Sequence, residues 1–151
     1  MLTLPTETLV QLIRAKLACL IELRDMGVRQ LELIEAGNIT ALLDVLSAKQ
    51  RPLAQLRRIE QALTPFHEQP AERRIWPSPA TRAACAGQAR QCETLLCEII
   101  EQEGRSEALL VRRRDAAALQ LQEAHHAGRA RDAYIAAPRQ VINQLDLRSE
   151  N

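Results

Sequence analysis

Apolar residues recur at steps of three and four along most of the chain, a spacing that predicts helices rather than strands. The first run predicts one helix of about 30 residues, which at 1.5 Å per residue is roughly 45 Å long. Pro5 and Thr6 open this run, and Thr6 is expected to cap the first free amides. Gly37 is expected to stop the helix in the left-handed conformation, and Asn38 to cap the next helix. The stripe consists of Leu9, Leu12, Ile13, Leu17, Leu20, Val28, Leu31 and Ile34.

A second run predicts a helix that folds back on the first, because a connection as short as Gly37–Asn38 forces an antiparallel hairpin. Pro52 lies inside this run and lacks the amide that would bond one turn back, so the helix should bend or end near Gln50. The stripe resumes in phase after the proline, which favours a kink over a break. It consists of Ile39, Leu42, Leu43, Leu46, Leu53, Leu56, Ile59 and Leu63.

The periodicity stops from Thr64 to Ser78, a segment with three prolines that is typical of a crossover loop. Phe66 and Trp76 lie in this segment, and two of the three aromatic residues of the chain are expected to pin it to the bundle. Ser78–Pro79 then predicts a helix start, a capping residue followed by proline at the first helical position.

The third helix carries a stripe whose first half is lined with small residues: Ala84, Cys85, Ala89, Cys92, Leu95, Leu96, Ile99 and Ile100. Gly104 and Ser106 either end it and cap a fourth helix, or the stripe passes through them to form one very long helix. A final helical stretch is expected to stop before Pro138, and it carries Leu109, Leu110, Ala117, Leu121, Ala124, Ala130 and Tyr134.

The pattern predicts one helical bundle domain over residues 1–137 and a tail over 138–151, in which Val141, Ile142 and Leu145 would share one face of a short helix. Packing of this tail back over the end of the bundle and ordering of the tail on a partner protein are equally compatible with the pattern.

Composition supports the helical interpretation, because Leu, Ala, Gln, Glu and Arg dominate and only one Phe, one Trp and one Tyr occur. We therefore expect an all-α fold, an elongated antiparallel bundle of three or four long helices with coiled-coil-like packing. A chain of 151 residues buries enough surface to fold without a metal or disulfide. The N-terminus has no signal-peptide pattern and no stretch approaches the roughly 20 apolar residues of a membrane span, so a cytoplasmic protein without membrane insertion is expected.

The net charge of +1 argues against nucleic acid as an obligate partner. Arg112, Arg113 and Arg114 form the densest basic run, but on a helix they point in different directions and are best explained as a solvated face. The cysteines are expected to be reduced and to act as small hydrophobic residues within helices. They are Cys19, Cys85, Cys92 and Cys97.

Candidate catalytic chemistry is sparse. Glu123 and His126 form a single Glu-x-x-His pair, whereas a bundle metal site needs a second copy, so a solvated helix face is favoured over a metal site. Phosphate-binding loops, nucleophile elbows and Cys/His pairings are not found in the sequence. We therefore expect no enzyme activity and no cofactor, and instead a protein that binds another protein along exposed helical surface.

The stretch from Leu31 to Leu63 resembles FlgN-type flagellar export chaperones, in which a long first helix leads through a Glu-x-Gly-Asp-like turn into a second helix. The matching positions are Glu35, Gly37, Asn38, Leu42, Leu43, Lys49 and Gln50. The pattern from Leu95 through Leu110 to Tyr134 also looks like the second half of the family. The chain departs from the family at Pro52, at Ser106 in place of a common Asn, and after Tyr134, where the usual Asp-x-x-Gly is missing.

The resemblance implies a cytoplasmic chaperone that shields the terminal helices of hook-filament junction proteins and delivers them to the flagellar export gate. Tyr134, Val141, Ile142 and Leu145 are then the candidate partner contacts. A structural coiled-coil adaptor or homo-oligomer without an export role is the alternative, and a metal-dependent bundle using Glu123 and His126 is a third.

Overall fold

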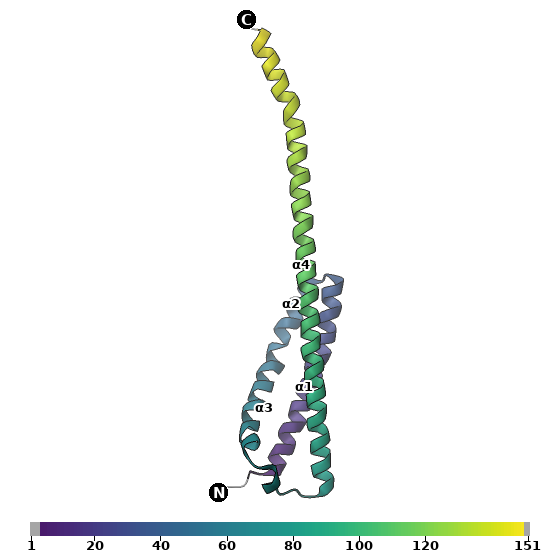
Figure 1. The fold of residues 1–151 in the computed structure, drawn as a ribbon, viewed down its shortest axis with the longest axis vertical. Helices are drawn as coiled ribbons and strands as arrows, with labels where there is room; N and C mark the ends of the chain where they lie inside the picture. Colours follow the sequence, from purple (N-terminus) through teal and green to yellow (C-terminus); the bar gives the residue numbers. More distant parts are fainter. Residues whose placement is uncertain (1–3, 150–151) are drawn as a thin grey trace. The chain divides into compact units, whose positions relative to one another are not determined.

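The computed structural model describes residues 4–149, and the side-chain surroundings of residues 4–136. Every regular element in this part of the chain is helical, which confirms the all-α prediction (Figure 1). The elements are α1 (Thr6–Ala36), α2 (Ile39–Ala48), α3 (Gln50–Glu68), the short 3-10 helix η1 (Ala71–Arg73) and α4 (Pro79–Ser149).

The chain divides into two compact units, Met1–Leu109 and Leu110–Asn151. The first unit holds α1, α2, α3, η1 and the start of α4, and the second holds the rest of α4. The helix passes through Gly104 and Ser106 without interruption, which decides between the two alternatives for the third and fourth helices. It also continues past Pro138, where we expected it to stop, because good helix formers such as Ala136 and Gln140 flank the proline on both sides.

The connection between α1 and α2 is the tight helical hairpin that the sequence predicts. Gly37 adopts the left-handed conformation, with φ 71° and ψ 20°. The amide of Asn38 donates to the carbonyl of Leu33 at 3.0 Å, which satisfies an otherwise free carbonyl at the helix end. Asn38 Oδ1 accepts from the amide of Ala41 at 3.1 Å and so caps α2.

Only Lys49 separates α2 from α3, and its dihedral angles, φ −65° and ψ −20°, stay right-handed helical. The interruption is thus the kink expected from Pro52, which has no amide for the carbonyl one turn earlier. The expected loop start at Thr64 is wrong, because α3 continues through Pro65 to Glu68. Leu63 and Phe66 are both buried in the core on this turn, and their burial stabilises the helix across the proline.

The crossover segment after α3 is held against the first unit, as the aromatic residues predict. Trp76 packs against the core, and the Arg74 guanidinium donates to the carbonyl of Phe66 at 2.6 Å. Thr6 Oγ1 donates to the carbonyl of Ile75 at 2.7 Å. Thr6 is therefore not the cap of α1 that we expected: the helix begins at Thr6 itself, and its hydroxyl fastens the loop instead.

The Ser78–Pro79 signal starts α4 as predicted, with the amide of Thr81 donating to Ser78 Oγ at 3.1 Å. The first part of α4 packs on α1, and Cys92 Sγ lies 3.9 Å from the carbonyl oxygen of Ile13. The core between α1, α3 and this part of α4 is formed by Leu9, Ile13, Cys19, Leu20, Leu23, Ile59, Leu63, Phe66, Cys85, Cys92 and Leu95.

Three of the four cysteines serve as small core residues, as expected. Cys97 differs, because it lies on an exposed face of α4. All four are free thiols. Within the described part of the chain, no helix has the combination of length and apolar character that spanning a bilayer requires.

Candidate partner-binding surfaces

Tyr134, the first sequence-predicted contact residue, lies in the second unit and is 83% exposed. The other three, Val141, Ile142 and Leu145, fall within the bounds of α4, but their side chains lie outside the described residues. The structure therefore places one of the four predicted side chains, and that one is fully available to a partner.

The helix of the second unit presents further large apolar side chains to solvent. Leu121 is 73% exposed, and Leu119 and Ile135 are also exposed. Leu121 and Ile135 are separated by 14 residues, about four helical turns, so they point to the same side of the helix. We call this side the α4 stripe; it consists of Ala117, Leu121, Ala124, Gly128 and Ile135.

The remaining candidates in the second unit are solvated. Glu123 and His126 are exposed, and the part of the chain described by the structure contains no group of three or more metal-ligating side chains. The arginines at 112, 113 and 114 are exposed as well, and Arg114 pairs with the neighbouring Asp115 at 3.2 Å.

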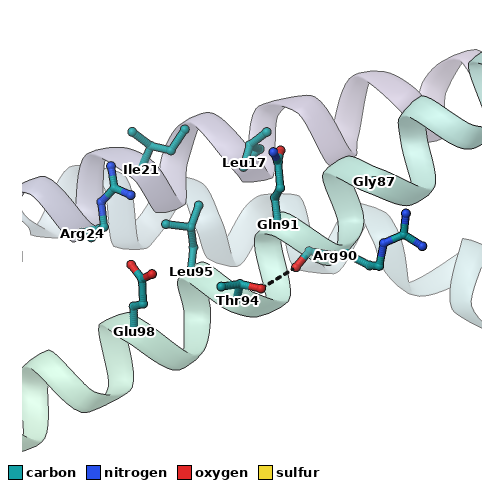
Figure 2. A pocket seen from close by; sticks show the side chains of 9 residues that line it. All are labelled: Leu17, Ile21, Arg24, Gly87, Arg90, Gln91, Thr94, Leu95 and Glu98. Atoms are coloured by element: carbon teal, nitrogen blue, oxygen red, sulfur yellow. Dashed lines mark hydrogen bonds between the residues drawn. The ribbon is translucent and has the colours of Figure 1, made fainter.

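A groove between α1 and α4 in the first unit is a second surface that the sequence analysis missed (Figure 2). It has a volume of about 530 Å³. Leu17 and Ile21 of α1 and Leu95 of α4 supply its apolar side chains, and Arg24, Arg90 and Glu98 its charges. Gly87, Gln91 and Thr94 complete the lining, and Thr94 Oγ1 donates to the carbonyl of Arg90 at 3.2 Å.

The groove follows from a second apolar stripe on α1, which we call the α1 outer stripe: Leu17, Ile21 and Val28. The core stripe of α1 is buried by α3 and α4, whereas Ile21 remains 38% exposed and Val28 46% exposed. The sequence analysis assigned Leu17 and Val28 to the single stripe that faces the core and did not use Ile21. At about 100° per residue, these three residues lie more than a quarter of a turn around α1 from the buried Leu23 and Ile34, and that offset was the available signal of a second apolar side.

A buried polar cluster lies at the kink between α2 and α3. The side chain of Lys49 is only 8% exposed, and its Nζ donates to Gln30 Oε1 at 2.9 Å and to Glu103 Oε1. Gln102 is also buried, and its Nε2 donates to the carbonyl of Arg24 at 3.2 Å. A Cβ at Gly27 would collide with Gln102 Oε1, so this glycine permits the close approach of α1 and α4. The cluster thus joins three helices through one buried ammonium group.

Burial changes the chemistry of the core cysteines. Desolvation raises the pKa of the thiols of Cys19, Cys85 and Cys92 above the ordinary value of 9.0. Neighbouring charges act less strongly on each of these pKa values. The three thiols are therefore neutral at physiological pH and serve packing, not nucleophilic chemistry.

Comparison with family models, curated proteins and solved structures finds no match.

Proposed function

We propose that the chain is a cytoplasmic flagellar type III export chaperone. It binds hook-filament junction proteins through the exposed helical surface of α4 and the segment 138–151, and presents them to the export gate. The resemblance of residues 31–63 to FlgN-type chaperones supports the family. The exposed apolar side chains of the second unit support the binding role, and Tyr134 with the α4 stripe is the observation that carries it.

The chemistry of this surface suits a helical client. A helix with two large apolar side chains on one face and small residues between them can lie closely against another amphipathic helix. Covering a Leu or Ile side chain contributes about 1.5–3 kcal/mol, so Leu121 and Ile135 supply several kcal/mol towards binding. Tyr134 adds an aromatic anchor that carries a hydroxyl donor, a residue type common among binding hot spots.

The proposal is tested by measuring the affinity of a purified hook-filament junction protein for the full chain and for three variants. Deletion of 138–151, and the double variant Leu121→Ala/Ile135→Ala, are each expected to weaken binding by about tenfold or more, since each removes apolar side chains that the client would cover. Gln122→Ala, an exposed residue on the other side of the same helix, is the matched control and should bind like the parent chain.

Circular dichroism checks that the variants remain helical. Unchanged affinity of the truncated chain would remove the tail from the binding surface. Unchanged affinity of the double variant would remove the α4 stripe. Failure of the parent chain to bind any junction protein would reject the export role itself.

The alternative, a coiled-coil adaptor or homo-oligomer, draws on the same stripe, because the steps of four, three, four and seven from Ala117 to Ile135 match coiled-coil spacing. Analytical ultracentrifugation separates the two proposals. A tight oligomer that does not dissociate on dilution, and that Leu121→Asp disrupts, would favour self-assembly over client binding.

A further inference from the structure

We propose that the groove between α1 and α4 seats one amphipathic helix of a partner protein, with acidic side chains flanking its apolar stripe. This surface belongs to the first unit and is distinct from the α4 stripe and Tyr134. The inference therefore does not depend on the export role or on the identity of the client.

The first argument is apolar surface on α1 that the bundle leaves uncovered. Ile13, Leu20 and Leu23 are buried on its core side, whereas Ile21 and Val28 of the outer stripe remain exposed. Leu17 to Val28 is eleven residues, roughly 16 Å along a helix, or about three turns of an incoming helix laid beside it. Covering such a stripe is what drives an amphipathic helix into a groove.

The second argument is the open backbone of α4 opposite this stripe. A Cβ built at Gly87 meets no atom within 4 Å, so the glycine is not needed for packing inside the unit. It leaves a gap in the side-chain ridge of α4, next to Gln91 and Leu95 (Figure 2). Helices pack by setting the ridge of one into the groove of another, and this gap admits a ridge from outside.

The third argument is charge. Arg24 and Arg90 line the groove from opposite helices, against the single carboxylate of Glu98. The Arg24 guanidinium pairs with the exposed Asp25 beside it in the chain, at 3.3 Å, whereas the Arg90 guanidinium makes no ion pair within the described part of the chain. Guanidinium groups pair well with carboxylates, so acidic flanks on the partner helix match this rim.

The same charges disfavour a second copy of this chain as the occupant. In a two-fold symmetric dimer, the groove would meet itself, so the second copy would bring another unpaired Arg90 to the rim and no carboxylate beyond the copy of Glu98. A concave surface also needs a convex partner, and a single helix provides that shape whereas the same groove on another copy does not.

The test uses the full chain and three fluorescent synthetic peptides of about four helical turns, which share one Leu/Ala stripe. Their flanking residues are Glu, Gln or Lys, and binding is followed by fluorescence anisotropy. Gly87→Trp fills the groove, and Gly104→Trp is its matched control, because a Cβ at Gly104 also meets open space but does not line the groove. Arg90→Glu reverses one rim charge, and Arg57→Glu does the same at an exposed site on α3.

We expect the Glu-flanked peptide to bind the parent chain at least about fivefold more tightly than the Lys-flanked one, as expected for surface ion pairs. Gly87→Trp should weaken this peptide by about tenfold or more, while Gly104→Trp leaves its affinity unchanged. Arg90→Glu should shrink or reverse the preference for Glu, and Arg57→Glu should not. Thermal unfolding will show whether Gly87→Trp disturbs the fold. If it does, the change in peptide preference caused by Arg90→Glu still tests the proposal.

Equal affinity for Glu- and Lys-flanked peptides, or equal affinity of the Gly87→Trp and Gly104→Trp chains, would overturn the proposal. Self-association of the parent chain that Gly87→Trp abolishes would also overturn it, and would make the groove a homodimer interface. Deletion of 138–151 should leave peptide binding intact, which separates failure of this inference from failure of the client surface in the second unit.

Discussion

The ion pair between the buried Lys49 and the half-exposed Glu103 yields the sharpest prediction for stability. Lys49 lies at the kink between α2 and α3, and its ammonium group is held by Gln30 from α1 and by Glu103 from α4. Replacing Glu103 by Gln removes the counter-charge but keeps an oxygen acceptor of similar shape. The lysine side chain, 8% exposed, would then keep a charge in a poorly solvated place.

The size of the effect follows from the exposure of the two partners. Breaking a fully buried ion pair costs about 3–5 kcal/mol, and breaking an exposed one about 0.2–1 kcal/mol. Since the Glu103 side chain is 49% exposed, water screens part of the attraction, and we expect Glu103→Gln to lower the free energy of unfolding by about 1.5 kcal/mol. The midpoint of thermal unfolding should fall by roughly 3–6 °C for a chain of this size.

Urea unfolding followed by circular dichroism measures this free energy, with Glu107→Gln, an exposed carboxylate one turn away on α4, as the control. The decisive comparison repeats Glu103→Gln in a Lys49→Met background, where no ammonium group remains to be stranded. There the same substitution should be nearly neutral, which gives a coupling energy of about 1–1.5 kcal/mol. An equal loss in both backgrounds, or a loss no larger than that of Glu107→Gln, would refute the reasoning.

Two further predictions concern the hairpin and the core thiols. Gly37→Ala should lower the free energy of unfolding by about 1–2 kcal/mol, because the alanine side chain is sterically disfavoured at φ 71°. Gly104→Ala, in regular helix with open space around the added Cβ, should raise the free energy of unfolding by up to about 1 kcal/mol. Urea titrations that show the same sign for both substitutions would contradict this prediction. Because burial raises the pKa of three core thiols, the unfolded chain ionises them first, so their contribution to stability is present below the unfolded-state value of 9.0 and is lost as pH rises through the folded-state pKa values. The thiols are those of Cys19, Cys85 and Cys92. Thermal unfolding from about pH 7.5 to 10.5 measures the loss of stability, and a variant with alanine at all three positions should show a smaller loss. An equal loss in the triple variant would contradict the explanation.

Features set by neighbouring residues were predictable from the sequence. At Gly37–Asn38 and Ser78–Pro79, the residue that stops or starts a helix bonds to atoms no more than five residues away. The kink before Pro52 is local in the same sense. The predictions failed where distant contacts outweigh local preference: Thr6 bonds to a carbonyl 69 residues away, and α3 continues through Pro65 because Phe66 is buried.

The buried lysine and the binding surfaces were harder to predict from the sequence. A lysine is normally assigned to solvent, so burial of Lys49 depends on Gln30 and Glu103, which the chain brings together only after three helices have packed. The groove likewise depends on how far α1 and α4 stand apart, and no local pattern encodes that distance. Tyr134 was predicted from the sequence as a partner contact, and it is exposed; the exposed Leu121 and Ile135 lie on a different side of the same helix and were not singled out.

The long sequence separation between α1 and the first part of α4 also sets the order of folding. The hairpin closes across two residues, whereas the bonds from Cys92 to Ile13 and from Gln102 to Arg24 span 79 and 78 residues. Because the entropy cost of closing a loop rises with its length, the hairpin is expected to form first and α4 to dock last. Until that docking, the apolar core side of the hairpin is open to proteases and to other unfinished chains, so α4 controls how long the nascent protein is vulnerable.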